Sequence, residues 1–187
     1  MLTPEEAHIV SQLKQGKNKE KAFQELVNLY KEPLYWHIRN IVKNHDDTDD
    51  VLQNTFIKVF RYIDNFKEES KLYSWLYRIA SNESFTFLSK KAKRLKISDE
   101  ELQESLIENL TSDTYFEGKT IQIALQKAIN TLPEKQKVVF QMKYFEDLKY
   151  QEIAEILEVT EGTAKSNYHH AVQKIKNNLE DHSTFDF

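Results

Sequence analysis

One stretch near the carboxyl end of the chain carries side chains whose types and spacing suit contact with nucleic acid. Apolar residues spaced three or four apart predict the buried stripe of a helix: Ala164, Tyr168, Ala171 and Ile175. The residues that this stripe leaves on the outer faces are short, polar or basic: Thr163, Lys165, Ser166, Asn167, His169 and His170. Near a helix N-terminus, such side chains can reach base edges and phosphates in a major groove.

A short helix and a turn precede this stretch. In residues 150–157, Ile153, Ala154 and Leu157 are expected to face inward, and the small Ala154 permits a close helix crossing. After the turn, Thr160 can cap the next helix. The pattern predicts a helix-turn-helix. An ordinary helical hairpin with a solvated outer face is the alternative.

A second group of polar residues lies in the first half of the chain. The spacing of five apolar residues predicts one helix over 51–66: Leu52, Phe56, Val59, Ile63 and Phe66. Its exposed side would carry Asp49, Asp50, Gln53, Asn54 and Lys58. Capping of the helix N-terminus alone would explain the two aspartates. A calcium loop is a poor alternative, because the mid-loop glycine and the distal glutamate are missing.

A third group combines aromatic and basic side chains in residues 70–94. The core face of this predicted helix consists of Leu72, Leu76, Ile79 and Ala80. Trp75 lies beside that face and is expected to be buried, whereas Tyr73 and Tyr77 lie one turn apart on a flank. A basic run follows: Lys90, Lys91, Lys93 and Arg94. Aromatic rings and cations together can hold unpaired bases and their backbone.

Helices are expected throughout the rest of the chain. Thr3, Pro4 and Glu6 indicate a capped helix that ends at Gly16. A second helix should end before Pro33, with a third beginning at Leu34. Further helices are expected to end at Pro133 and to lie over 138–145. No alternation of period two persists, so the fold class is all-α.

Composition excludes several classes of protein. The 187 residues include no cysteine, three glycines and three prolines, which argues against disulfides, thiolate metal sites and glycine-rich phosphate loops. No apolar run approaches the length of a membrane span, and the N-terminus lacks an apolar secretory core, so a cytoplasmic protein with no membrane insertion is expected.

An enzyme is not expected either. The motifs His-Glu-x-x-His, Gly-x-Ser-x-Gly and the Walker loop are absent from the sequence. The adjacent His169 and His170 point to different helix faces, which makes them a poor metal site. We therefore expect no catalytic residue, no metal and no cofactor.

Charge divides the chain into three parts. Residues 1–98 carry a net charge of +4, residues 99–118 carry −7 with no basic residue, and residues 119–179 carry +2; the last eight residues add −3, which gives the overall −4. We interpret 1–98 and 119–187 as two small helical domains and 99–118 as an acidic linker that interrupts the helical pattern. The helix-turn-helix lies in the second domain.

Residues 132–176 resemble the C-terminal promoter-reading domain of bacterial RNA polymerase sigma factors of the sigma-70 family, in the short extracytoplasmic-function (ECF) group. Residues 49–56, DDVLQNTF, are similar to the family's core-polymerase-binding helix. Residues 74–82, SWLYRIASN, are similar to its promoter-melting helix. The three motifs stand in the family's order, and the match spans roughly residues 20–178.

The resemblance implies a sigma factor that joins core RNA polymerase, recognises −35 and −10 elements and helps to open the duplex, without catalysing a reaction. The outer residues 163–170 named above would contact the −35 element. Contacts to the −10 element and the melted strand would come from Asn65, Phe66, Tyr73, Tyr77, Asn82, Lys90, Lys91 and Arg94. The clamp helices of the largest polymerase subunit would bind Asp49, Asp50, Gln53, Asn54, Phe56 and Lys58. The family also makes an anti-sigma factor plausible as a partner.

Several residues depart from the family pattern. Asn167 and His170 stand where arginines are common, and Glu158 where glycine is common. Thr86 and Ser89 replace acidic and arginine residues. Residues 64–70 correspond to the loop that captures a flipped −10 base, here called the base-capture loop, and its two glutamates are unusual beside DNA. These changes bear on which promoter is read.

A different class of protein remains open from the sequence. A helix-turn-helix regulator with an unrelated helical sensor domain would share the C-terminal motif. It would give no reason for the motifs at 49–56 and 74–82.

Overall fold

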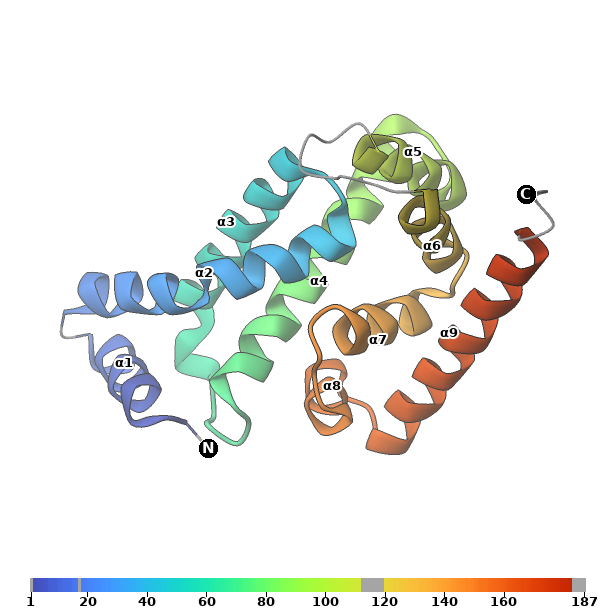
Figure 1. The fold of residues 1–187 in the computed structure, drawn as a ribbon. Coiled ribbons are helices and arrows are strands. Elements are labelled where there is room, and N and C mark those ends of the chain that lie inside the picture. Colours follow the sequence, from blue (N-terminus) through green and yellow to red (C-terminus); the bar gives the residue numbers. More distant parts are fainter. Residues whose placement is uncertain (1, 17, 112–119, 183–187) are drawn as a thin grey trace. The chain divides into compact units, whose positions relative to one another are not determined.

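The computed structural model describes residues 2–16, 18–111 and 120–182, and every regular element within these ranges is helical (Figure 1). The elements, in chain order, are α1 (Pro4–Gln15), α2 (Lys19–Val42), α3 (His45–Tyr62), the 3₁₀ helix η1 (Ile63–Asn65), α4 (Leu72–Leu95), α5 (Asp99–Thr111), α6 (Thr120–Asn130), α7 (Glu134–Tyr144), α8 (Tyr150–Leu157) and α9 (Glu161–His182). The chain divides into two compact units, residues 1–91 and 92–187. The all-α class and the presence of two helical units are confirmed.

Helix α1 begins and ends where its residues predict. The Thr3 hydroxyl accepts from the Glu6 N–H at 3.2 Å, and the Thr3 N–H donates to Glu6 Oε2 at 2.6 Å. Gly16 ends the helix with a φ of 73°, a left-handed conformation that glycine adopts without strain. The second carboxylate oxygen of Glu6 accepts from the Tyr30 hydroxyl of α2. This cap therefore also ties α1 to its neighbour.

The expected break before Pro33 is wrong, because α2 continues through this proline to Val42. A proline inside a helix removes one hydrogen bond and costs roughly 3 kcal/mol. The apolar face nevertheless continues on both sides of it, with Leu26, Leu34 and Ile38 fully buried. Each such side chain contributes about 1.5–3 kcal/mol on burial. Tertiary packing outweighs the local preference.

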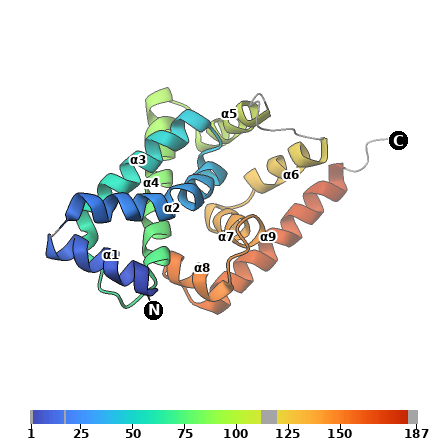
Figure 2. The ribbon, with the colours of Figure 1, turned by 60° about the vertical axis from the view of Figure 1, so that its left-hand side comes forward.

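Helices α2 and α3 pack together in the first unit, and side chains of both contact α4 (Figure 2). The buried His37 of α2 hydrogen-bonds Ser81 of α4 through Nε2 and Oγ, 2.8 Å apart. The hydroxyl of Tyr77 in α4 donates to the Pro33 carbonyl at 3.3 Å. The helix expected over 51–66 ends earlier, since α3 stops at Tyr62 and η1 follows.

The acidic segment does not simply interrupt the helical pattern, because its first part forms α5. The Ser98 hydroxyl accepts from the Glu101 N–H at 3.1 Å, and Glu101 accepts from the Ser98 N–H at 2.6 Å. Leu102 and Leu106, four residues apart, are buried. This capping box and leucine pair stabilise a helix despite the negative charge. Residues 112–118 lie outside the described residues, and the role of 99–118 as a linker stays a prediction.

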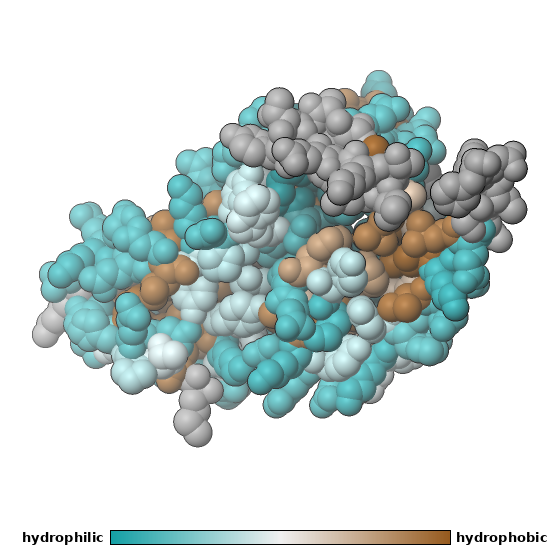
Figure 3. Space-filling view, in the orientation of Figure 1, coloured by the Kyte–Doolittle hydropathy of each residue, from teal (hydrophilic) through white to brown (hydrophobic). Residues whose placement is uncertain are grey.

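Helices α6, α7, α8 and α9 form the core of the second unit. Its buried cluster consists of Ala128, Ile129, Leu132, Phe140, Ala171 and Ile175. Tyr168 packs against this cluster, with its ring stacked 5.9 Å from that of Phe140. In Figure 3, hydrophilic colouring follows the outer side of α9, and apolar colouring gathers where α6 and α9 meet.

Stability of the first unit should depend on pH through Glu6. Burial opposes ionisation of this carboxyl, but hydrogen bonds from Tyr30 and Thr3 outweigh it and leave the pKa below its ordinary value of 4.5. A carboxyl with a lowered folded pKa stabilises the fold above the unfolded pKa and loses that effect as pH falls through the folded pKa.

We expect Glu6→Gln to lower the free energy of unfolding at neutral pH by less than about 1 kcal/mol, since the carboxyl is only partly buried and solvent still screens its charge. The difference from wild type should vanish as pH falls well below 4.5. Urea unfolding followed by tryptophan fluorescence measures it, because Trp36 and Trp75 both lie in the first unit. A difference that stays constant across this range would contradict the prediction.

Candidate functional site

The helix-turn-helix is built from α8, a tight turn and α9. Glu158 ends α8 in a left-handed conformation, with φ 54° and ψ 44°. The Val159 N–H then donates to the Ala154 carbonyl at 3.0 Å. Thr160 caps α9, since its hydroxyl accepts from the Thr163 N–H at 3.1 Å. These local bonds fix the angle at which α9 leaves the turn.

Helix α9 brings the six predicted −35 residues onto one exposed surface. Ala164 and Ala171 are completely buried and set the rotation of the helix. The outward residues are exposed, apart from a half-buried Asn167: Thr163, Lys165, Ser166, His169 and His170. The Thr163 hydroxyl lies 2.8 Å from that of Thr160, so it also takes part in the cap. The expected surface is present, and its contacts with DNA stay a prediction.

Lys165 already has a partner on its own helix. Its ammonium lies 2.7 Å from a carboxylate oxygen of Glu161, one turn earlier, and both side chains are about half exposed. The hydrogen bond that Lys165 donates to this carboxylate raises the pKa of Lys165, which therefore stays a cation. An exposed pair of this kind contributes little to stability. A phosphate could replace Glu161 at small cost.

A second lysine, which the sequence analysis did not single out, lies beside the same site. The Lys143 and Lys165 ammonium groups are each 5.8 Å from the ring centroid of Tyr150, at the start of α8. Lys143 also pairs with Asp147 at 2.9 Å, and this hydrogen bond raises the pKa of the lysine. The two lysines are 22 positions apart, so only the folded helix-turn-helix shows their proximity. The basic residues that precede α8 in the sequence were the signal from which this part of the site could have been predicted.

The exposed side of α3 carries most of the predicted polymerase-binding residues. Asp49, Asp50, Gln53, Asn54 and Lys58 are exposed, and Lys58 pairs with Glu83 of α4. Phe56 is the exception, because only 8% of it is exposed and its ring packs edge-on against Phe23. We therefore correct Phe56 to a core residue. Ile57, which is 49% exposed, lies outside the apolar stripe and joins this surface.

The residues predicted to contact the −10 element fall into two groups. Asn65, Asn82, Lys90 and Arg94 are exposed, and Tyr73 is half-buried. Phe66 and Tyr77 are buried, with exposures of 2% and 4%.

The two buried aromatic residues are corrected to core residues. Phe66 packs against Trp75, with ring centroids 5.3 Å apart, and Trp75 is buried as expected. Tyr77 packs against His37 at 4.6 Å. Lys91 is mostly covered and pairs with Asp47 of α3, so it is less accessible than the neighbouring Lys90. The basic surface of α4 is therefore narrower than the sequence predicted.

Two features are absent from the described ranges. No cluster of three or more histidine, aspartate or glutamate side chains there could hold a metal ion. None of the described helices is long and apolar enough to cross a membrane.

A helix-turn-helix in one of two helical units is typical of a DNA-binding protein. Comparison with known proteins specifies the class. Residues 26–94 match the model of Sigma-70 region 2, and residues 122–175 match that of Sigma-70 region 4.

Among curated proteins, an ECF RNA polymerase sigma-E factor of Haemophilus influenzae is 31% identical over 182 residues, which cover 92% of this chain and 94% of the relative. The ECF RNA polymerase sigma factor SigW of Bacillus subtilis is 27% identical, over 92% of this chain and 95% of its own. The chain belongs to the ECF group of sigma-70 RNA polymerase sigma factors. It is a transcription initiation factor that binds core RNA polymerase and promoter DNA, and it is not an enzyme.

Solved structures agree with this fold. CnrH, solved in complex with the cytosolic domain of CnrY, has a TM-score of 0.66 at 20% identity, with coverage of 92% of this chain and 96% of CnrH. RpoE from Bartonella quintana, solved with the anti-sigma factor NepR, has a TM-score of 0.62 at 21% identity, with coverage of 86% and 98%. The alternative of a regulator with an unrelated sensor domain is wrong, because the match to Sigma-70 region 2 covers most of the first unit.

The left-handed turn residue Glu158 gives a direct test of the turn. An L-residue in this conformation destabilises the fold by about 1–2 kcal/mol. Glycine avoids this strain, but its greater flexibility in the unfolded chain costs about 0.5–1 kcal/mol of folding free energy. Glu158→Gly should therefore stabilise the second unit by up to about 1 kcal/mol. Hydrogen exchange of α8 and α9 amides, which reports on this unit separately, should slow by up to about fivefold.

The matched control is Glu155→Gly, which makes the same replacement within α8. It should destabilise the helix by about 1 kcal/mol and speed the same exchange. Faster exchange in Glu158→Gly would show that the turn is not strained.

Proposed function

We propose that the outward surface of α9 reads the −35 element of duplex promoter DNA. Its members are Thr163, Lys165, Ser166, Asn167, His169 and His170. The observation that carries this proposal is the rotation of α9, which buries Ala164 and Ala171 and leaves these residues outside. Lys143 and Lys149 extend the basic surface to the start of α8, where a helix-turn-helix commonly meets the phosphate backbone.

We also propose that the exposed part of α4 and the base-capture loop bind the melted −10 strand. Tyr73 offers part of an aromatic face, and Asn65 and Asn82 offer amides for base edges. Lys90 and Arg94, four residues apart and both exposed, attract the phosphate backbone. Phe66 and Tyr77 support this surface from the core.

The exposed side of α3 is proposed as the site that binds the clamp helices of the polymerase's largest subunit. Asp49 and Asp50 provide negative charge, and Gln53 and Asn54 provide hydrogen bonds on adjacent turns. Ile57 adds an exposed apolar side chain to the same face. Charge steers such an encounter, and apolar contact stabilises the complex.

Membership of the family supports three broader assignments: the domains, the cellular location and a further partner. We infer that residues 1–98 and 119–187 act as separate promoter-binding domains connected through 99–118, and that the protein works in the cytoplasm, where its polymerase lies. We further infer an anti-sigma partner, because RpoE from Bartonella quintana, which has a similar fold, was solved with the anti-sigma factor NepR bound.

Simultaneous replacement of Lys165, Ser166 and His170 by alanine tests the −35 assignment. Because each lost base contact costs about 1–3 kcal/mol, we expect promoter affinity of the holoenzyme to fall at least about tenfold. Fluorescence anisotropy with a labelled promoter duplex measures this loss.

The matched control replaces three exposed residues further along α9, Gln173, Lys174 and Asn177, by alanine. This variant removes one cation and two polar groups, as the first does, and should bind as wild type. Equal affinity of both triple variants would reject the assignment.

Charge reversal at Asp50 tests the polymerase contact. Asp50→Lys should weaken assembly with core polymerase by about tenfold or more, because it removes one attraction and adds one repulsion. The free protein should keep its melting temperature, since Asp50 is exposed. Glu32→Lys, at an exposed position of α2, makes the same charge change elsewhere in this unit. An assembly constant for Asp50→Lys equal to that of this control would refute the assignment.

A further inference from the structure

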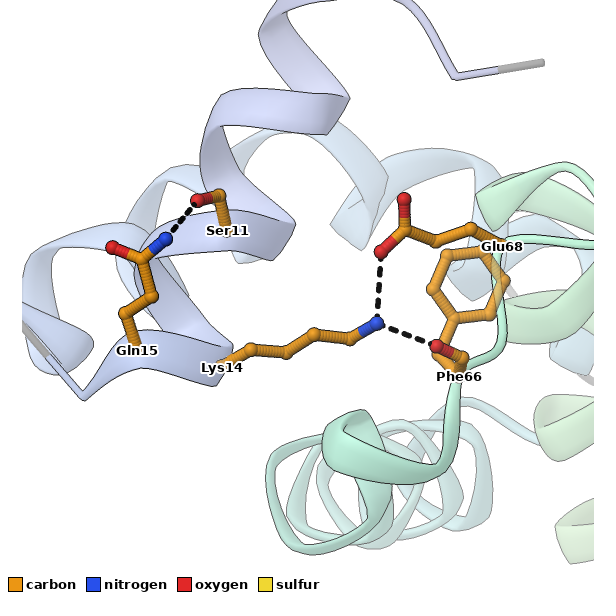
Figure 4. Close-up of polar contacts among 5 residues, drawn as sticks. All are labelled: Ser11, Lys14, Gln15, Phe66 and Glu68. Atoms are coloured by element: carbon orange, nitrogen blue, oxygen red, sulfur yellow. Dashed lines mark hydrogen bonds and ion pairs between the residues drawn. The ribbon is translucent and has the colours of Figure 1, made fainter.

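A single lysine of α1 connects that helix to the base-capture loop, residues 64–70. The Lys14 ammonium donates to the Phe66 carbonyl at 2.7 Å and to Glu68 Oε1 at 2.8 Å (Figure 4). It also lies 5.7 Å from the ring centroid of Phe66. The neighbouring Gln15 bonds only Ser11 of its own helix in the same view, at 2.9 Å. Lys14 thus holds two loop residues, two positions apart, with one cation.

Both ends of this connection are fixed in the core. Ile9, Val10 and Leu13 bury the inner face of α1. Phe66 is itself buried, and its N–H donates to the Ile63 carbonyl at 3.0 Å. The Lys14 side chain is only 28% exposed between these elements. A cation held in this way restricts the loop more than a freely solvated surface pair does.

The loop has an unfavourable backbone conformation at the residue that Lys14 holds. Glu68 has a φ of 62°, in the left-handed region that side chains other than glycine rarely adopt. Such conformations persist where surrounding contacts impose them, and they are frequent at functional sites. The two Lys14 hydrogen bonds reach the backbone carbonyl of Phe66 and the side chain of Glu68, so one cation holds the loop on both sides of Lys67, next to the strained backbone.

Lys14 also changes the electrostatics of the loop. Three acidic residues lie in it, Asp64, Glu68 and Glu69, and carboxylates repel a nucleic-acid backbone. Glu68 is about half exposed, and its charge is offset at 2.8 Å by Lys14. The acidic composition that is unusual beside DNA is therefore partly neutralised from α1.

We propose that Lys14 is a positioning residue for capture of an unpaired −10 base: it fixes the turn of the base-capture loop and neutralises Glu68, although it need not touch DNA itself. This inference rests on the proposed contact between the loop and the melted −10 strand. Helix α1 precedes the segment that matches Sigma-70 region 2, residues 26–94. The chain's N-terminal helix thus contributes to promoter recognition through the loop.

The test uses holoenzyme assembled with core polymerase. Its probes are single-stranded oligonucleotides of the nontemplate strand from a promoter that the wild-type holoenzyme opens, intact or with one −10 base at a time replaced by an abasic site. For each position, the ratio of the two dissociation constants measures how much the base itself contributes. Changes in stability or general charge affect both probes alike, so they leave this ratio unchanged.

We expect wild type to show a large ratio at one position and Lys14→Met to reduce it at least about fivefold, with smaller changes at other positions. Lys14→Arg should keep the ratio, because arginine can bond both acceptors. Lys21→Met is the matched control: it removes the same charge from an exposed pair with Glu25 on α2, away from the loop. It should behave as wild type.

A second variant separates positioning from folding. In the Lys14→Met background, Glu68→Gly removes the unpaired carboxylate and allows the left-handed turn without an anchor. This double variant should recover the ratio, whereas a general folding defect would persist. If wild type shows no position with a large ratio, the proposed contact of the loop with the −10 strand fails. If wild type shows one and Lys14→Met retains it, the contact stands and the role of Lys14 is overturned.

Discussion

Packing of α2 against α3 and α4 determines where every exposed group of the first unit lies. Leu34 and Ile38 of α2 and Val59 of α3 are fully buried in that unit. The buried hydrogen bond between His37 and Ser81 specifies how α2 and α4 align, because a shifted helix would break it. With this alignment set, the polar side of α3, the basic end of α4 and the loop between them face outward. Each proposed contact of this unit thus depends on the same packing.

The second unit follows the same logic on a smaller scale. Small buried residues at 164 and 171 let α9 approach its neighbours closely, and the aromatic residues Phe140 and Tyr168 fill the remaining space. The proposed reading surface is the part of α9 that this packing leaves uncovered. The types of its side chains determine the chemistry of this surface. The two buried alanines and the threonine cap determine which side chains face outward.

The sequence predicted the helices more accurately than it predicted which side chains are buried. Local chemistry determined the start of α1 and the bounds of α8, because caps and short apolar periods act within a few residues. The continuation of α2 through Pro33 depends on partners distant along the chain, which periodicity does not report. Helix α5 has local signals, the capping box of Ser98 and Glu101 and the pair of leucines, which the interpretation of 99–118 as a linker did not use. Phe56, Phe66 and Tyr77 resemble contact residues by type, yet neighbouring helices cover them. Proximity across the fold, as between Lys14 and Glu68 or Lys143 and Tyr150, required the structure.

The pair between Lys165 and Glu161 has a consequence for the salt dependence of DNA binding. In the free protein the carboxylate holds the Lys165 ammonium at 2.7 Å, so a phosphate that binds this lysine would replace an anion that is already there. Binding at this point exchanges one anion for another and releases fewer condensed counterions than a solvated lysine would. Because this exchange is the same for every duplex that contacts Lys165, it lowers the salt dependence of binding to promoters and to other DNA alike, and it leaves the choice between them to the neighbouring polar residues.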